Sequence, residues 1–123
     1  MVRALGIAAA IVALSSNFAF AAGDATKGAA IFNRCAMCHS NTKGAPNRIG
    51  PNLFGVVGRK AGTVADFSYS SAVKASGIVW TPENLGKWVM GPGKFIPGNR
   101  MTFAGLSSQT QADDLVAYLE TLK

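Results

Sequence analysis

The sequence is poor in the side chains from which most metal sites are built. Only two of its 123 residues are cysteine and one is histidine, whereas a structural zinc site takes four such ligands. Its six acidic residues suggest no acid–base pair of the kind that hydrolytic enzymes use. No segment alternates polar and apolar residues as a strand does, and no repeat or low-complexity tract is present. These shortages argue against zinc modules and β-rich folds and favour a small helical domain.

Long apolar runs are also missing. The longest, Ala4 to Leu14, falls short of the ~20 residues that a helix needs to cross a membrane. It follows Arg3 and precedes Ala19-Phe20-Ala21, the small-x-small pattern of a signal peptidase site. We therefore expect residues 1–21 to be a cleaved export signal and residues 22–123 to form one domain. The alternative is an uncleaved membrane anchor.

Basic residues outnumber acidic ones by 12 to 6, which gives a formal net charge of +6. A basic surface suits nucleic acid, anionic lipid or an acidic protein partner. Nucleic acid does not fit an exported protein whose only adjacent basic pair is Arg59-Lys60. Charge alone leaves open whether the other basic residues form a docking surface or only keep the chain in solution.

The domain region predicts about four short helices between long loops. Capping residues and apolar spacing place these helices near residues 24–35, 70–77, 81–90 and 108–122. Residues 44–62 hold five glycines and two prolines, and residues 93–105 form a second loop. Loops of this length need something to pack against, and an internal cofactor supplies it.

Cys35-Ala36-Met37-Cys38-His39 has the Cys-x-x-Cys-His spacing of a covalent haem attachment site. On a helical turn, residues three apart face the same side, so both thiols can add to the two vinyl groups along one haem edge. His39 then lies beneath the ring, with its imidazole toward iron. A disulfide between these cysteines would stabilise little, because the loop it closes is very short. A thioredoxin-type pair requires a βαβ context that the sequence does not show. The motif therefore predicts one haem c.

Elimination narrows the second iron ligand to two methionines. His39 is the only histidine, so methionine sulfur is the usual alternative in an electron-carrying haem protein. Met1 leaves with the export signal, and Met37 is held within the attachment turn. Met90 closes a predicted helix, whereas Met101 lies in the second long loop, which can cover the opposite face of haem. Met101 is the favoured ligand and Met90 the alternative.

The succession of motifs resembles the class I cytochromes c of the mitochondrial-like bacterial group over nearly the whole domain. The matching segments, in family order, are Gly23-Asp24, Lys27-Gly28, Ile31-Phe32, Cys35 to His39, Gly50-Pro51-Asn52-Leu53-x-Gly55, Gly58-Arg59-Lys60-x-Gly62, Phe67-x-Tyr69, Gly77-Ile78-x-Trp80, Ile96-Pro97-Gly98-x-x-Met101-x-Phe103-x-Gly105 and Asp114-Leu115-x-Ala117-Tyr118-Leu119. The resemblance implies an all-α cytochrome c fold wrapped around one covalently bound haem. It also implies a soluble periplasmic electron carrier, not an enzyme, that shuttles single electrons between respiratory or photosynthetic complexes.

The resemblance further implies roles for individual residues. Pro51 would present its carbonyl to the N–H of His39, and Gly28 and Phe32 would meet the last helix at Leu115 and Tyr118. Three residues would satisfy the haem propionates, namely Arg59, Tyr69 and Trp80. The expected cofactor-binding set is Cys35, Cys38, His39, Met101, Pro51, Arg59, Tyr69 and Trp80, of which His39 and Met101 bind iron.

The chain departs from the mitochondrial pattern near the iron and at the haem edge. Trp88 stands where the pattern has a tyrosine that reaches the methionine sulfur. Val73 replaces an asparagine of an internal water network, and Asn99 replaces a threonine of the same network. Three edge lysines are replaced, by Gly93, Ser107 and Ser108. Basic residues remain at Arg34, Arg48, Lys94 and Arg100.

The retained charges predict docking to acidic sites on membrane redox complexes or redox enzymes, by a carrier that is itself a monomer. The loss of three lysines instead favours a more apolar docking face. Two other functional classes stay open. One is a haem enzyme or gas sensor, which requires Met101 to leave the iron. The other is a secreted, disulfide-stapled binding module without haem.

Overall fold

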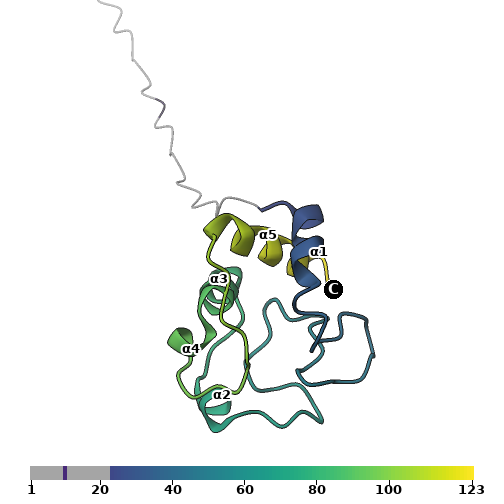
Figure 1. Cartoon of the computed structure of the whole chain (residues 1–123), viewed down its shortest axis with the longest axis vertical. Coiled ribbons are helices and arrows are strands. Elements are labelled where there is room, and N and C mark those ends of the chain that lie inside the picture. Colours follow the sequence, from purple (N-terminus) through teal and green to yellow (C-terminus); the bar gives the residue numbers. More distant parts are fainter. Residues whose placement is uncertain (1–9, 11–22) are drawn as a thin grey trace, which may run out of the picture.

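Five helices joined by long loops form the domain (Figure 1). In this computed structural model, which describes residues 10 and 23–123, they are α1 (Ala25–Phe32), α2 (Ser71–Ala75), α3 (Pro82–Met90), α4 (Pro92–Phe95) and α5 (Gln109–Glu120). Within these residues the only β-type pairing is an isolated bridge between Lys60 and Val79, so the expected all-α fold is confirmed. Apart from Ala10, the expected export signal lies outside the described residues. None of the helices described is long and apolar enough to span a bilayer.

Four of the helices have side-chain N-caps, and these caps are the expected residues. Asp24 Oδ1 accepts hydrogen bonds from the N–H groups of Thr26 and Lys27 at the start of α1. The side chains of Ser70, Thr81 and Ser108 each accept from the N–H three residues further on. Such caps depend on neighbours in the sequence alone, which is why they can be predicted.

Two helix boundaries differ from the prediction. α1 ends at Phe32 rather than at Cys35, and residues 33–38 continue as irregular turns. α4 is a fifth helix that occupies the start of the expected loop 93–105. Pro92 stands at its first position, where the fixed φ of proline favours a new helical turn directly after Gly91 ends α3.

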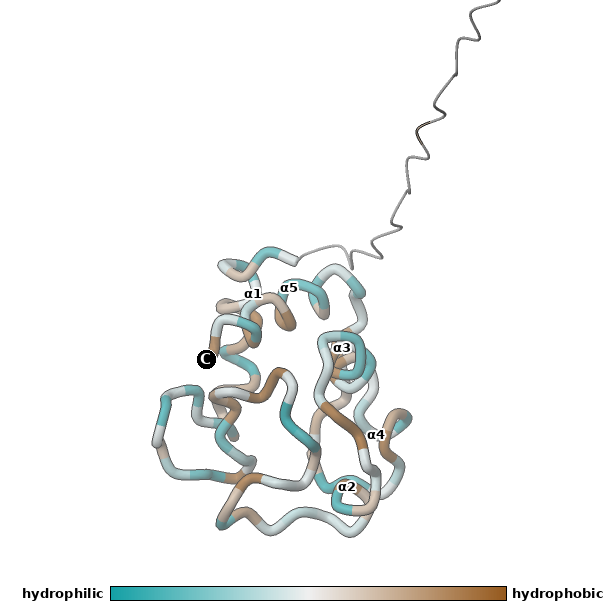
Figure 2. Tube along the Cα trace, turned by 180° about the vertical axis from the view of Figure 1, so that it is seen from behind, coloured by the Kyte–Doolittle hydropathy of each residue, from teal (hydrophilic) through white to brown (hydrophobic). Residues whose placement is uncertain are grey.

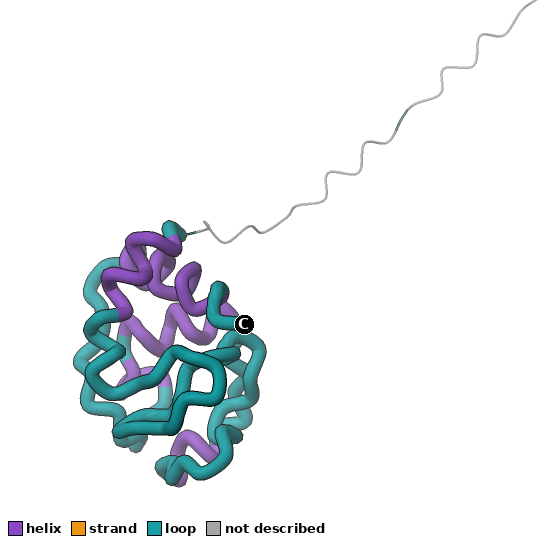
Figure 3. The backbone as a smooth tube through the Cα atoms, turned by 90° about the vertical axis from the view of Figure 1, so that its right-hand side faces the viewer, coloured by secondary structure: helices purple, strands orange, loops and turns teal. Residues whose placement is uncertain are grey.

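α1 and α5 pack against each other at one end of the molecule, and Figure 3 shows that helix dominates this end while loops form most of the other. Gly28 makes the close approach possible. A Cβ added there would overlap the Asp114 carbonyl and lie 2.8 Å from Tyr118 Cβ. Phe32 packs on the ring of Tyr118, with 5.1 Å between the ring centroids. The first and last helices therefore meet at Gly28, Phe32 and Tyr118, as the resemblance implied.

The buried core extends from this crossing to α3 and into the loops. Its members are Phe32, Val56, Ala61, Trp80, Leu85, Val89, Ile96, Leu106, Ala112, Leu115, Val116 and Leu119. Trp80 packs against Trp88 and Phe95, with ring centroids 5.3 and 6.4 Å away. Figure 2 shows hydrophobic stretches in the loops as well as in the helices. The loops thus contribute side chains to the interior instead of only connecting helices.

Candidate haem site

The attachment motif lies in the turns that follow α1. The N–H groups of Cys38 and His39 both donate to the carbonyl of Cys35, at 3.0 and 2.9 Å, and close the turn. Both cysteines are free thiols and partly buried. Burial raises the pKa of the Cys35 thiol, and the nearby charge of Arg34 offsets this only in part. The turn therefore presents two thiols and one imidazole from a single short segment.

The ring of His39 is fixed by a backbone carbonyl. His39 Nδ1 lies 2.7 Å from the carbonyl oxygen of Pro51. A carbonyl only accepts, so Nδ1 carries the proton and Nε2 keeps a free lone pair. Burial lowers the pKa of His39, the Pro51 hydrogen bond raises it in part, and the charge of Arg48 lowers it further. The imidazole is therefore neutral at pH 7, in the tautomer that a metal ligand requires.

Gly50 leaves space for the ring of His39 because it has no side chain, a role that its sequence position alone does not reveal. Gly50 is buried, and a Cβ built on it would lie 2.6 Å from His39 Nδ1 and 2.8 Å from Nε2. Its N–H donates to the Cys38 carbonyl at 2.8 Å, which holds the loop against the attachment turn. The only signal in the sequence is a glycine directly before Pro51.

Arg48 supports the attachment turn from the outside. Its guanidinium donates to the carbonyl oxygens of Ala36 and Met37, at 2.6 and 3.2 Å. These are the two residues between the cysteines. The sequence alone indicates only a docking role for Arg48, because hydrogen bonds across this loop leave no local pattern.

The residues expected at the propionates lie together. Arg59 donates to the carbonyls of Asn52 and Phe54, at 3.0 and 2.5 Å, and its own carbonyl accepts from the N–H of Trp80 at 2.8 Å. The Tyr69 hydroxyl accepts from the N–H of Val64 at 3.1 Å. Burial lowers the pKa of Arg59 and raises that of Tyr69, and each group's electrostatic effect on the other opposes that shift. A half-buried guanidinium beside a phenol hydroxyl can bind an anionic group.

Met101 lies half-buried in the loop after α4, whereas Met90 closes α3 and packs against the core. This loop contacts the attachment turn through Arg34, whose guanidinium lies 5.1 Å from the centroid of the Phe103 ring. The far end of the loop is fixed at Gly105. A Cβ there would lie 2.8 Å from the Met90 carbonyl carbon. The two thiols and the imidazole come from one short segment, and the loop that carries Met101 contacts that segment through Phe103 and Arg34.

Comparison with known proteins agrees with this geometry. Residues 25–123 match the sequence profile of the family described as cytochrome c. The chain belongs to the cytochrome c family. It is 47% identical over 100 residues to cytochrome c2 of Agrobacterium tumefaciens (strain II Chrys), covering 79% of this chain and 90% of that protein. It is 46% identical over 98 residues to cytochrome c-550 of Ancylobacter novellus, covering 77% and 92%.

A solved structure supports the same assignment. Cytochrome cH from Methylobacterium extorquens is 43% identical to this chain and superposes with a TM-score of 0.76, covering 80% of this chain and 99% of that one. As a class I cytochrome c, the chain carries haem c bound covalently through Cys35 and Cys38. It is an electron carrier and not an enzyme, and it exchanges electrons with redox partners.

Proposed function

We propose that this cytochrome c is a soluble, exported shuttle whose iron is held by His39 and Met101 and which passes single electrons between respiratory or photosynthetic complexes. The observation that carries the proposal is the His39–Pro51 hydrogen bond of 2.7 Å, because it leaves Nε2 free to bind iron. If His39 and Met101 both bind the iron, they would leave it no open position for a substrate, and haem held in this way would supply outer-sphere electron transfer.

The chain's residues tune this exchange electrostatically. Bound haem supplies a one-electron couple between ferrous and ferric iron. The Pro51 carbonyl orients the imidazole and raises its basicity. The partial burial of His39 would disfavour the additional charge of the ferric state, and a low-dielectric site would therefore raise the reduction potential. Arg59 and Tyr69 would hold the propionates, and the hydrogen bond from the N–H of Trp80 to the Arg59 carbonyl supports this role.

The ligand assignment is tested by a pair of methionine variants. Met101→Ala should abolish the weak far-red sulfur-to-iron absorption band of the oxidised protein and open the iron to cyanide or carbon monoxide. Met90→Ala is the matched control and should leave the spectrum nearly unchanged, because Met90 packs against the core. The reverse pattern would show that Met90 is the ligand.

The contacts of Gly23 and Asp24 fit a cleavage site just before them. A Cβ on Gly23 would lie 2.5 Å from Asp114 N, and the N–H of Asp24 donates to Asp114 Oδ1 at 2.8 Å. Residues that follow the expected cleavage site at Ala21 are therefore part of the packed domain. An intact mass that begins at Ala22 supports a cleaved periplasmic form. A mass that includes residues 1–21 supports the membrane anchor.

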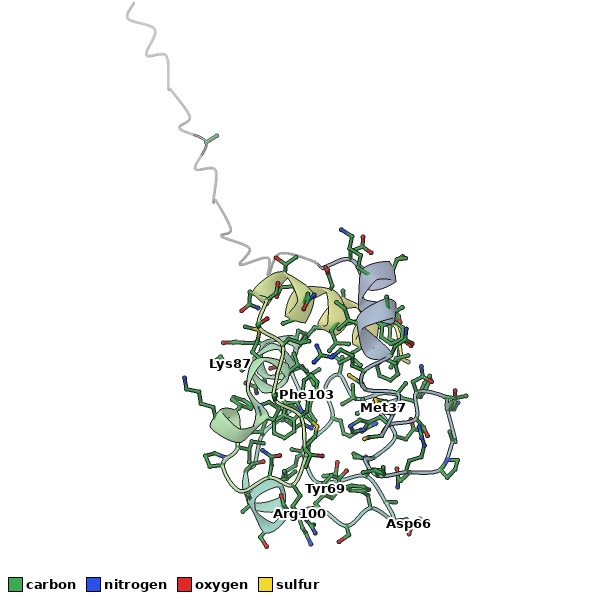
Figure 4. The ribbon with its side chains drawn as sticks, in the orientation of Figure 1. Met37, Asp66, Tyr69, Lys87, Arg100 and Phe103 are labelled. Carbon is green, nitrogen blue, oxygen red and sulfur yellow. The ribbon has the colours of Figure 1, made fainter. Side chains whose placement is uncertain are left out.

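The surface around the attachment turn combines charge with exposed apolar side chains. The side chains of Met37 and Ile49 are 73% and 77% exposed. The carbonyl of Met37 accepts a hydrogen bond from Arg48, and Ile49 follows Arg48 in the chain. Arg34, Lys94 and Arg100 are also exposed. Four of the six acidic residues lie instead on α5 or at the N-cap of α1. Figure 4 places Arg100 and Tyr69 toward the end of the molecule opposite α1 and α5. The exposed basic side chains on the attachment turn, on α4 and beside Met101 support an acidic partner.

A further inference from the structure

The side chain of Asn99 joins α4 to the backbone of Met101. Asn99 Nδ2 donates to the carbonyl oxygens of Pro92 and Ile96, both at 2.9 Å. Asn99 Oδ1 accepts from the N–H of Met101 at 2.8 Å. The side chain is half-buried. A primary amide has two donor hydrogens and an acceptor oxygen, and here both kinds of group are engaged.

The two carbonyls that Asn99 binds belong to well-fixed residues. Pro92 is among the largest fully buried side chains of the described chain, and Ile96 is 5% exposed. They stand at the first residue and the C-cap of α4. A helix of one turn has almost no stability of its own. Asn99 therefore links Met101 to side chains that the core holds in place.

A loop that is ordered in advance binds iron more tightly through its methionine than a loop that must be ordered on binding. Residues 97–101 have no regular helix or strand, and Gly98 turns the chain with a φ of +87°. The contacts at Phe103 and Gly105 hold the loop on the other side of Met101. Asn99 supplies the matching constraint two residues before Met101. The single hydroxyl of a threonine, which the family resemblance places here, could not make all three bonds.

We propose that Asn99 is a positioning residue that keeps the sulfur of Met101 on the iron. This inference rests on the proposed function, because it assumes that Met101 is the axial ligand. It predicts that Asn99 controls how readily the methionine leaves, while haem attachment through Cys35 and Cys38 is unaffected.

The test is Asn99→Ala, read by the far-red sulfur–iron band and by imidazole binding to the ferric holoprotein. Imidazole competes with methionine, so its apparent affinity measures how often the sulfur is off the iron. We expect the variant to bind imidazole at least tenfold more tightly (about 1.4 kcal/mol), with a weakened far-red band and unchanged covalent haem content. Asn84→Ala is the matched control, since Asn84 donates to the Val79 carbonyl at 2.8 Å at the start of α3. It should behave as the parent does.

A second variant covers the case in which Asn99→Ala does not fold. Asn99→Asp keeps the acceptor for the Met101 N–H but loses both donors. Its affinity for imidazole should therefore lie between those of the parent and Met101→Ala. The proposal is overturned if the variant that folds keeps the far-red band and the imidazole affinity of the parent. It is also overturned if Asn84→Ala changes both readouts as much as the Asn99 variant does. A parent protein that lacks the far-red band and binds imidazole as Met101→Ala does would show instead that the ligand assignment is wrong, and the role of Asn99 would fall with it.

Discussion

Replacing Gly50 by alanine perturbs the imidazole of His39, the proposed iron ligand, without removing any functional group. The backbone of Gly50 lies outside the left-handed region, so alanine can adopt its conformation. The added methyl would meet the ring of His39, 2.6 Å from Nδ1 and 2.8 Å from Nε2. Ordinary contacts between such atoms are about 3.5–4.0 Å. The ring must therefore move by roughly 1 Å relative to its support.

The size of the effect follows from two costs. Overpacking a well-filled interior costs about 1–3 kcal/mol. Moving the ring also weakens the hydrogen bond from Nδ1 to the Pro51 carbonyl, which contributes about 0.5–1.5 kcal/mol. We expect Gly50→Ala to lose roughly 2–4 kcal/mol of unfolding free energy. A changed reduction potential should accompany the loss, because the orientation and basicity of the axial imidazole depend on that bond.

Denaturant unfolding and a redox titration of the holoprotein measure both effects. Gly86→Ala is the control, because Gly86 lies within α3 and an added Cβ meets nothing within 4 Å. Alanine there should leave the potential unchanged and stabilise the helix by about 0.4–1 kcal/mol. If Gly50→Ala matches the parent in stability and potential, Gly50 does not hold the ring and this account of the proximal side is wrong.

Two further predictions concern haem attachment and docking. Cys35→Ala, Cys38→Ala or His39→Ala should abolish stable holoprotein, since the loops that contribute to the core would lose their cofactor; folded, haem-free His39→Ala at normal yield would contradict this. The rate of electron transfer to an isolated oxidase should fall steeply as ionic strength rises through ~0.15 M, where the screening length is about 8 Å. Arg100→Gln should slow electron transfer at low salt, whereas the control Lys27→Gln, on α1 at the other end of the molecule, should not. A flat salt profile favours the apolar docking face.

The sequence predicts best what depends on neighbouring residues. Four helix starts were predictable because the caps at Asp24, Ser70, Thr81 and Ser108 bind N–H groups two or three residues away. The end of α1 and the existence of α4 were not. Irregular turns around the attachment motif replace the end of the expected first helix, and α4 forms where a buried proline starts a single turn inside an apparent loop.

The same limit applies to the site. Cys35, Cys38 and His39 form a contiguous motif whose spacing reports its chemistry. Gly50 and Arg48 act through contacts that only the fold creates. A Cα without a side chain lies beside an imidazole, and a guanidinium donates to carbonyls eleven and twelve residues away. Arg48 is the clearest example, because a basic residue that looked like docking charge also supports the attachment turn.

We infer that one covalently bound haem, ligated on both faces by protein, carries one electron at a time. A spectroscopic redox titration of the purified protein is the decisive measurement. We expect a single one-electron transition, with haem that stays attached after denaturation and a far-red sulfur–iron band that is present only in the oxidised state. A colourless protein, or a haem protein without that band that binds exogenous ligands freely, would contradict it.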